Sequence, residues 1–259
     1  MSSLYDLKGK VAFVTGAGLG GLGAQTAIAF AKVGCDVVVA DLPSREQDLK
    51  QTVQKINEYS KNSFYVTMDI TKENQIDDAI TEVIDKFGKL DILVNSAGVM
   101  LRKPTFETSL LEWQKIIDVN LTGTWLLARR AGRELTKQGH GKIINFSSLY
   151  ANMVGPLPEP AYYASKAGVV NLTRGLASEW GKQNVQVNCI APGVFFPTNM
   201  TEPLADQPGR LEQMADRTLL GRLGDPEKDI SGVVLFLASA ASDYITGQLI
   251  AVDGGWSAW

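Results

Sequence analysis

The stretch VAFVTGAGLGGLG, residues 11–23, decides the fold, because it joins an apolar run to five glycines within nine residues. A glycine-rich turn between a buried strand and a helix lets main-chain N–H groups approach a phosphate, and the helix dipole adds positive potential there. The pattern GxGxxG fits twice, from Gly16 through Gly18 to Gly21 and from Gly18 through Gly20 to Gly23. The stretch therefore predicts either a dinucleotide-binding turn, in one of two registers, or an ordinary tight turn.

The composition is typical of a soluble globular protein, with 45% hydrophobic and 20% charged residues among 259. The net charge of −3 offers no basic field for a polyanion, so we expect no nucleic-acid partner. The start, MSSLYDLKGK, lacks the apolar core of a signal peptide, and no run approaches the ~20 apolar residues of a membrane span. We therefore predict a cytoplasmic protein without a membrane partner.

The cysteines and the single histidine argue against several kinds of site. Cys35 and Cys189 lie in separate apolar segments, which is typical of buried thiols in a reducing compartment rather than of a disulfide. His140 stands alone, so it cannot build a metal site or a Ser-His-Asp triad. We expect His140 in a surface turn and no metal ion in the site.

Seven short apolar runs alternate with amphipathic helical segments. Runs that are apolar throughout suit strands buried on both faces, and the segments between them are long enough for crossover helices, as at 75–87. No linker or repeat divides the chain. We predict a single α/β domain over 1–259. The predicted architecture is a Rossmann fold whose doubly wound, seven-stranded parallel sheet has helices on both faces. We expect its strands at 11–14, 36–40, 63–68, 90–95, 142–146, 185–190 and 248–252. Prolines and clustered charges break the alternation at 197–226, where we expect a substrate lid.

An acidic residue, Asp41, ends the second predicted strand, twenty residues beyond Gly21. In this fold such a carboxylate accepts hydrogen bonds from the adenosine ribose diol. The 2′-phosphate of NADP would meet that negative charge, and the nearest cation in the sequence is Arg45. We therefore predict NAD as the cofactor; the alternative for Asp41 is a solvated acid at a strand end.

Tyr162 and Lys166 stand at positions i and i+4 of a predicted helix that opens at Pro160, so they share one face. A free phenol has a pKa of about 10, and a neighbouring ammonium lowers that pKa by favouring the phenolate. Tyr163 has Ala167 at the matching position and lacks this partner. The pair predicts a general acid/base, although a plain Tyr/Lys pair on a helix surface has the same spacing.

With these motifs the sequence resembles the short-chain dehydrogenase/reductase family over nearly its whole length. The motifs come in order: the glycine-rich turn, Asp41, Asp69-Ile70, Asn95-Ser-Ala-Gly98, Val119-Asn-Leu121, Asn145-Phe-Ser-Ser148, Tyr162-xxx-Lys166, Ala191-Pro-Gly193 and Val252-Asp-Gly-Gly255. The resemblance implies an NAD-dependent oxidoreductase that interconverts a secondary alcohol and a ketone by hydride transfer.

The resemblance also implies a role for each site residue. Tyr162 would be the general acid/base and Ser148 would hold the reacting oxygen, while Ser147 competes with Ser148 because neighbouring strand residues face opposite ways. Lys166 would hold the nicotinamide ribose and lower the pKa of Tyr162, and Asn120 would anchor a water that relays protons. The implied cofactor contacts are Gly16, Gly21, Leu22, Gly23, Asp41, Leu42, Asp69, Ile70, Asn95, Ala97, Gly98, Tyr162, Lys166, Pro192, Gly193, Val194 and Thr198.

The sequence departs from the family pattern at three points. The usual TGxxxGxG turn fits residues 15–23 only with one extra residue, as TGxxxxGxG, which favours the register Gly16, Gly21 and Gly23. Asn-Ser replaces the commoner Asn-Asn at 95–96, and the run that leads to Thr198 looks one residue long.

Segments outside the shared motifs resemble gluconate 5-dehydrogenases and 2-dehydro-3-deoxygluconate or 2-deoxygluconate dehydrogenases; they are Arg102-Lys103, Pro-Thr-Asn-Met200 and the segment 241–256. A sugar acid or polyol is the substrate that this resemblance implies. A guanidinium at Arg102, beside Ser148 and Tyr162, could hold a substrate carboxylate, and a solvated arginine or one paired with Glu107 is the alternative.

Two other functions share these motifs. One is a 3-oxoacyl-[acyl-carrier-protein] reductase, and the other is a non-catalytic NAD-binding regulator, against which the complete set Asn120, Ser148, Tyr162 and Lys166 argues. Members of the family are commonly homotetramers. The ending 256–259, with two tryptophans, looks exposed and would suit burial between subunits.

Overall fold

Strands and helices alternate along the chain in the computed structural model, which describes residues 4–258. The strands are β1 (Val11–Thr15), β2 (Asp36–Asp41), β3 (Phe64–Thr67), β4 (Ile92–Asn95), β5 (Gly141–Phe146), β6 (Val185–Pro192) and β7 (Leu249–Val252). The helices are α1 (Leu22–Lys32), α2 (Glu46–Ile56), α3 (Glu73–Phe87), α4 (Leu110–Ile117), α5 (Thr124–Gln138), α6 (Pro160–Trp180), α7 (Arg210–Asp216) and α8 (Ser231–Ala238).

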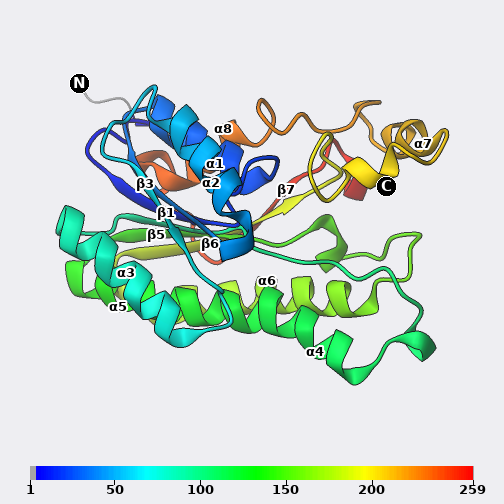
Figure 1. Ribbon diagram of the computed structural model, residues 1–259, viewed down its shortest axis with the longest axis horizontal. Helices are drawn as coiled ribbons and strands as arrows, with labels where there is room; N and C mark the ends of the chain where they lie inside the picture. The colour runs from blue at the N-terminus through cyan, green and yellow to red at the C-terminus, as the bar shows by residue number, and fades with distance from the viewer. Residues whose placement is uncertain (1–3, 259) are drawn as a thin grey trace.

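The seven strands form one parallel sheet in the order β3-β2-β1-β4-β5-β6-β7. Helices α1, α2 and α8 cover one face, and α3, α5 and α6 cover the other (Figure 1). The strand order reverses between β1 and β4, which is where a doubly wound sheet opens a ligand crevice at its carboxyl edge. The predicted seven-stranded Rossmann fold is confirmed.

Two apolar clusters hold the sheet between its helices. Every residue of β1 is buried, and successive side chains point to opposite faces. Ala12 and Val14 pack with the helices of one face, whereas Val11 and Phe13 pack with those of the other. Because both faces are covered by helices, apolar side chains are needed at consecutive positions, which explains the continuous apolar runs in the sequence.

The two cysteines and the single histidine lie in separate parts of the fold. Cys35 and Cys189 are buried free thiols. His140 precedes β5, where its partly exposed ring lies 3.2 Å from Asp91 Oδ1. Within residues 4–258, no helix is long and apolar enough to cross a membrane, and no group of His, Cys, Asp or Glu side chains suits a metal ion.

The segment 197–226 leaves the sheet after β6 and contains the short helix α7, which lies beside the C-terminal segment (Figure 1). Leu204 and Met214 of this segment pack with Leu149 and Trp256 in a small separate cluster. Trp256 is therefore buried within its own chain rather than exposed, because its large indole covers the apolar side of the 197–226 segment. Trp259 lies outside the described residues.

Candidate active site

A cleft of about 1200 Å³ opens at the carboxyl ends of the central strands and collects most of the residues that the sequence predicts for the site. Its wall includes Gly16, Gly21, Leu22, Asp41, Leu42, Asp69, Ile70, Ala97, Gly98, Arg102, Ser148, Tyr162, Lys166, Pro192, Gly193, Val194 and Thr198. Three further predicted residues, Gly23, Asn95 and Asn120, lie behind the wall and support it.

The glycine-rich loop packs too closely for side chains at two of its glycines. A Cβ at Gly23, in the first turn of α1, would collide with the carbonyl oxygen of Gly16, and a Cβ at Gly16 would lie 2.7 Å from the backbone of Ala97. Gly21 is the N-cap of α1. Helix α1 therefore begins where the register Gly16, Gly21 and Gly23 requires, and its first residues, Gly21 and Leu22, line the cleft.

The extra residue of this loop has a contact that no motif in the sequence indicates. Gly20 has φ +92°, and a Cβ there would collide with the side-chain amide of Asn199. The main-chain N–H of Asn199 donates to the Gly20 carbonyl at 2.9 Å, and its Nδ2 donates to the Leu19 carbonyl at 3.0 Å. The longer loop thus ties the predicted cofactor turn to the predicted lid.

Asp41 holds a fixed carboxylate at one end of the cleft. Its Oδ2 accepts from the Gly18 N–H at 2.9 Å, and its Oδ1 accepts from the Leu42 N–H at 2.8 Å. Arg45 also lines this end, where its Nη2 donates to the Leu19 carbonyl at 3.1 Å. The end of the cleft predicted for the adenosine ribose therefore carries one anchored acid and one nearby guanidinium.

Tyr162 and Ser148 meet in the middle of the cleft. Burial raises the pKa of the Tyr162 phenol to about 12, and a hydrogen bond with Ser148 acts in the opposite direction. The neighbouring Ser147 hydroxyl donates to the Lys166 carbonyl at 2.8 Å, on the other side of the chain. Ser148 is therefore the serine that faces Tyr162, as the family pattern indicates.

Lys166 lies one helical turn beyond Tyr162, with its Nζ 5.7 Å from the centroid of the phenol ring. The ammonium is fully buried and donates to the Phe146 carbonyl at 2.9 Å, and burial lowers its pKa to about 8. The prediction that Lys166 brings the pKa of Tyr162 below its ordinary value does not hold in this structure. Loss of solvation outweighs the favourable neighbours, so the net shift is upward.

Asn120 occupies a π-helical segment, Asp118–Gly123, between α4 and α5. Its Nδ2 donates to the Val99 carbonyl at 2.9 Å and to Ser165 Oγ at 3.0 Å, while its Oδ1 accepts from the Val99 N–H at 2.8 Å. Both amide hydrogens are thus used within the protein. Asn120 fixes the turn after β4 against α6, and the predicted relay water would have to bind one of its oxygens.

Asn95 is buried below the cleft rather than along its wall, which corrects its predicted position. Its Nδ2 donates to Asn145 Oδ1 at 2.8 Å, across the paired strands β4 and β5, and Asn145 in turn donates to Thr173 Oγ1 at 2.9 Å. The hydrogen bond to Asn145 holds the Asn95 side chain in the sheet layer, and the turn that follows brings Ser96 and Ala97 to the cleft wall instead.

Arg102 lines the cleft, but its partner is not Glu107. Its Nε donates at 2.9 Å to Oε1 of Glu159, which is only 1% exposed and precedes α6 as its N-cap residue. Burial raises the pKa of the Glu159 carboxyl, and the Arg102 guanidinium acts against that shift. Sequence reasoning missed Glu159; its place just before a helix that starts with Pro160 was the available signal.

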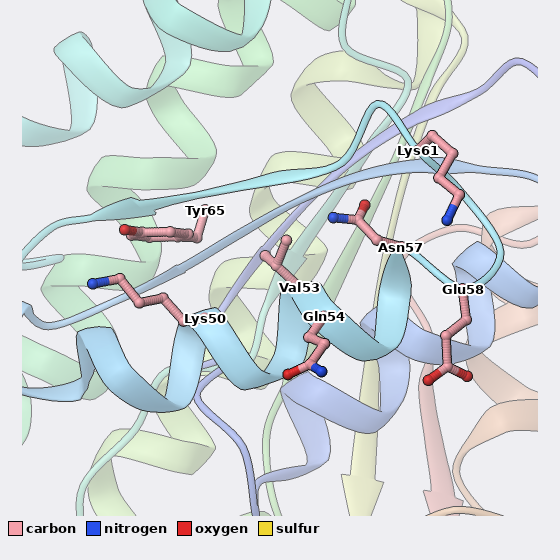
Figure 2. A pocket seen from close by; sticks show the side chains of 7 residues that line it. All are labelled: Lys50, Val53, Gln54, Asn57, Glu58, Lys61 and Tyr65. Atoms are coloured by element: carbon pink, nitrogen blue, oxygen red, sulfur yellow. The ribbon is translucent and has the colours of Figure 1, made fainter.

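A second, smaller hollow of about 520 Å³ lies between α2 and the β3 edge of the sheet (Figure 2). Side chains of Lys50, Val53, Gln54, Asn57, Glu58, Lys61 and Tyr65 surround it. It contains none of the predicted catalytic residues and lies four strands away from β5, which carries Ser148 at its end. The chemistry therefore belongs to the larger cleft.

Comparison with known proteins agrees with this geometry. The protein family described as enoyl-(acyl carrier protein) reductase matches residues 16–257. This chain belongs to the short-chain dehydrogenase/reductase family. As a member, it is an oxidoreductase that acts on CH–OH groups.

Similar members of the family include sugar-acid enzymes. A curated relative, 2-dehydro-3-deoxy-D-gluconate 5-dehydrogenase of Dickeya dadantii (strain 3937), is 38% identical over 255 residues, which cover 98% of each chain. The structure of a short-chain type dehydrogenase/reductase from Mycobacterium marinum is 35% identical with a TM-score of 0.91, covering 98% of each chain. A gluconate 5-dehydrogenase from Burkholderia cenocepacia J2315, solved with NADP and tartrate, is 32% identical with a TM-score of 0.90, again covering 98% of each chain.

Proposed function

We propose that this dehydrogenase interconverts a secondary hydroxyl and a ketone on a sugar acid of the gluconate type. The observation that carries the proposal is Arg102, whose guanidinium lines the same cleft as Ser148 and Tyr162. A fixed cation beside the reacting groups suits a substrate with a carboxylate, because a guanidinium binds a carboxylate through two charge-assisted hydrogen bonds. The names of the similar sugar-acid dehydrogenases support the same substrate class.

The cleft fits a dinucleotide, because a glycine cradle that leaves no room for Cβ atoms meets the free N–H groups of α1. We propose that the cofactor residues are those predicted from the sequence, with Gly23 and Asn95 acting as supports. Asn120, predicted as a catalytic residue, fixes the neighbouring turn through Val99. A bound nicotinamide supplies the hydride acceptor for oxidation and the hydride donor for reduction.

In the proposed oxidation, Ser148 Oγ holds the substrate oxygen by a hydrogen bond, and the Tyr162 phenolate removes the hydroxyl proton. The C–H bond at the same carbon breaks as the hydride leaves, and the carbonyl forms. In the reduction, Tyr162 returns the proton to the carbonyl oxygen. Lys166 holds the nicotinamide ribose from its buried position on α6, where its Nζ lies 5.7 Å from the centroid of the Tyr162 ring.

NAD is the proposed cofactor, because Asp41 presents a fixed carboxylate at the place where the ribose diol of adenosine binds in this fold. A relative was solved with NADP, and Arg45 lies at the same end of this cleft. The preference between the two cofactors therefore depends on this acid and this guanidinium together. We propose that the acid dominates, because the Arg45 guanidinium is already paired with Asp48, whose Oδ2 lies 2.6 Å from its Nε.

We also propose a single domain with a lid at 197–226, since Leu204 and Met214 lie both on the cleft wall and in the small apolar cluster. A homotetramer in the cytoplasm is the proposed form of the protein. Exposed apolar side chains on α4, among them Leu110 and Leu111, are 79% and 82% exposed and could be covered by another subunit.

The substrate class is tested by cofactor reduction with three matched sets: sugar acids such as gluconate, the corresponding neutral polyols, and 3-hydroxyacyl thioesters. We expect turnover with sugar acids. Arg102→Ala should raise the KM for a sugar acid by roughly tenfold or more, because the charged hydrogen bonds to the carboxylate are lost, and it should leave the KM for a polyol unchanged. A wild-type enzyme that oxidises only polyols or only acyl substrates would refute the proposal.

A further inference from the structure

The cleft contains a buried acid that the proposed reaction does not use. Glu159 lies three residues before Tyr162 and is 1% exposed, yet it contributes to the cleft wall. Its Oε1 accepts from Arg102 Nε at 2.9 Å, and its Oε2 has no hydrogen-bond partner among residues 4–258. A buried carboxylate with one unpaired oxygen is costly, so its presence at this position calls for a role.

The geometry of the pair leaves part of the guanidinium free to bind a ligand. Arg102 uses its Nε for Glu159, and within the part of the chain that the structure describes neither of its Nη groups has a recorded hydrogen bond. The side chain of Arg102 is 33% exposed, in contrast to its buried partner. A guanidinium can bind one carboxylate through its Nε edge and a second through its two Nη groups, because its five N–H donors lie in one fixed plane.

The charges around Glu159 are few. Arg102 is the cation that acts on its carboxyl, and the phenols of Tyr150, Tyr162 and Tyr163 face it from two other elements, η4 (Leu149–Ala151) and α6. Arg210 and Arg217, on and just after α7, act on Tyr150 rather than on Glu159. The charge that a substrate carboxylate meets at Arg102 is therefore governed mainly by one partner, Glu159.

We propose that Glu159 is a specificity-determining positioning residue, which anchors Arg102 through Nε, directs the two Nη groups into the cleft and limits their attraction for a substrate carboxylate. The proposal rests on the function proposed above, because it assigns Arg102 to the substrate. Anchoring and charge compensation are separable, since an amide keeps the acceptor oxygen of Glu159 but not its charge.

Two substitutions at Glu159 should therefore act in opposite directions. Glu159→Gln retains an oxygen for Arg102 Nε and removes the negative charge, so carboxylates should bind about threefold to tenfold more tightly. Glu159→Ala removes the anchor, so Arg102 should lose its orientation and carboxylates should bind about tenfold more weakly. A purely structural role for Glu159 would weaken binding in both variants and would also change the affinity for neutral polyols.

The experiment measures dissociation constants of tartrate and gluconate, with sorbitol as the neutral probe, on the full chain saturated with NADH, because the reduced cofactor cannot oxidise any of these alcohols. Glu112→Gln is the matched control. Glu112 pairs at 2.8 Å with Lys103, which follows Arg102 in the sequence, and neither Glu112 nor Lys103 lies on the cleft wall. This control should change none of the three affinities. In an Arg102→Ala background, Glu159→Gln should lose its effect on carboxylates.

Each outcome decides the proposal. Tighter carboxylate binding in Glu159→Gln supports the proposal if it is absent in the Arg102→Ala background and absent for sorbitol. If Glu159→Ala does not fold, the result with Glu159→Gln is sufficient by itself. Unchanged or weaker carboxylate binding in Glu159→Gln overturns it. Gluconate turnover by the wild type together with that result leaves the proposed function intact, whereas a wild type that binds neither tartrate nor gluconate overturns both.

Discussion

Asp41 offers the sharpest test of cofactor preference, through the substitution Asp41→Asn. The carboxylate is held by the N–H groups of Gly18 and Leu42, at 2.9 and 2.8 Å. Asparagine has nearly the same shape and keeps one oxygen for the Gly18 N–H, so the loop should retain its conformation. The change therefore removes the charge together with one hydrogen bond, the one that the exposed Leu42 N–H donates to Oδ1.

The size of the effect follows from the charges. Two unit charges about 4 Å apart near a protein surface interact with about 4 kcal/mol at an effective dielectric constant of about 20. Asp41 is partly exposed, and Arg45 lies at the same end of the cleft, so salt and the guanidinium both weaken the repulsion of a 2′-phosphate. We expect a net penalty of about 2 kcal/mol on NADP, which corresponds to roughly thirtyfold in kcat/KM.

The assay compares kcat/KM for NAD and NADP with one substrate at low ionic strength. The wild type should prefer NAD, and Asp41→Asn should reduce that preference by roughly thirtyfold, chiefly by improving NADP. Arg45→Gln should act in the opposite direction, because it removes the nearby cation. Equal kcat/KM values for both cofactors in the wild type, or an unchanged ratio in Asp41→Asn, would refute the electrostatic argument.

Three further predictions concern the tyrosine, the lysine and the loop. Tyr162→Phe should remove nearly all turnover while NADH binding, followed by fluorescence, stays close to wild type, and Tyr163→Phe should lower turnover only slightly. The reverse pattern would show that the general acid/base has been assigned to the wrong tyrosine. Because the pKa of Lys166 falls to about 8 on folding from an ordinary 10.5, the unfolded chain binds more protons between these values, so wild-type stability should rise with pH across that window by about 1.4 kcal/mol per unit relative to Lys166→Met. Urea unfolding of the wild type and of Lys166→Met, measured at several pH values from 7 to 10, tests this. If the free energy of unfolding depends on pH equally in both proteins, the prediction is contradicted. Gly20→Ala should lower the free energy of unfolding by about 1 to 3 kcal/mol, and Asn199→Ala in the same chain should restore only the part due to the collision, since the strained φ remains.

Local patterns determine the fold of this protein. The inner strands β1, β2 and β4 are buried on both faces, so their sequences must be apolar at consecutive positions, and that requirement is visible without any tertiary information. The Tyr162 and Lys166 spacing is also local, because one helical turn brings the two side chains to the same face. The need for glycine at positions 16 and 23 is also a local property, since a short loop between one strand and one helix leaves few conformations for a backbone that packs against itself.

Contacts between distant segments were decided only by the tertiary structure. Arg102 and Glu159 are 57 positions apart, and Asn199 reaches Leu19 across 180 positions, so neither pair leaves a periodic or motif signal in the sequence. The pKa of Tyr162 shows the same limit: the i+4 lysine predicts a downward shift, but the burial that reverses it comes from the packing of several elements around the phenol. Sequence spacing specifies which side chains share an element, whereas partners and solvation depend on how the elements pack, and the fine chemistry of this cleft follows from the latter.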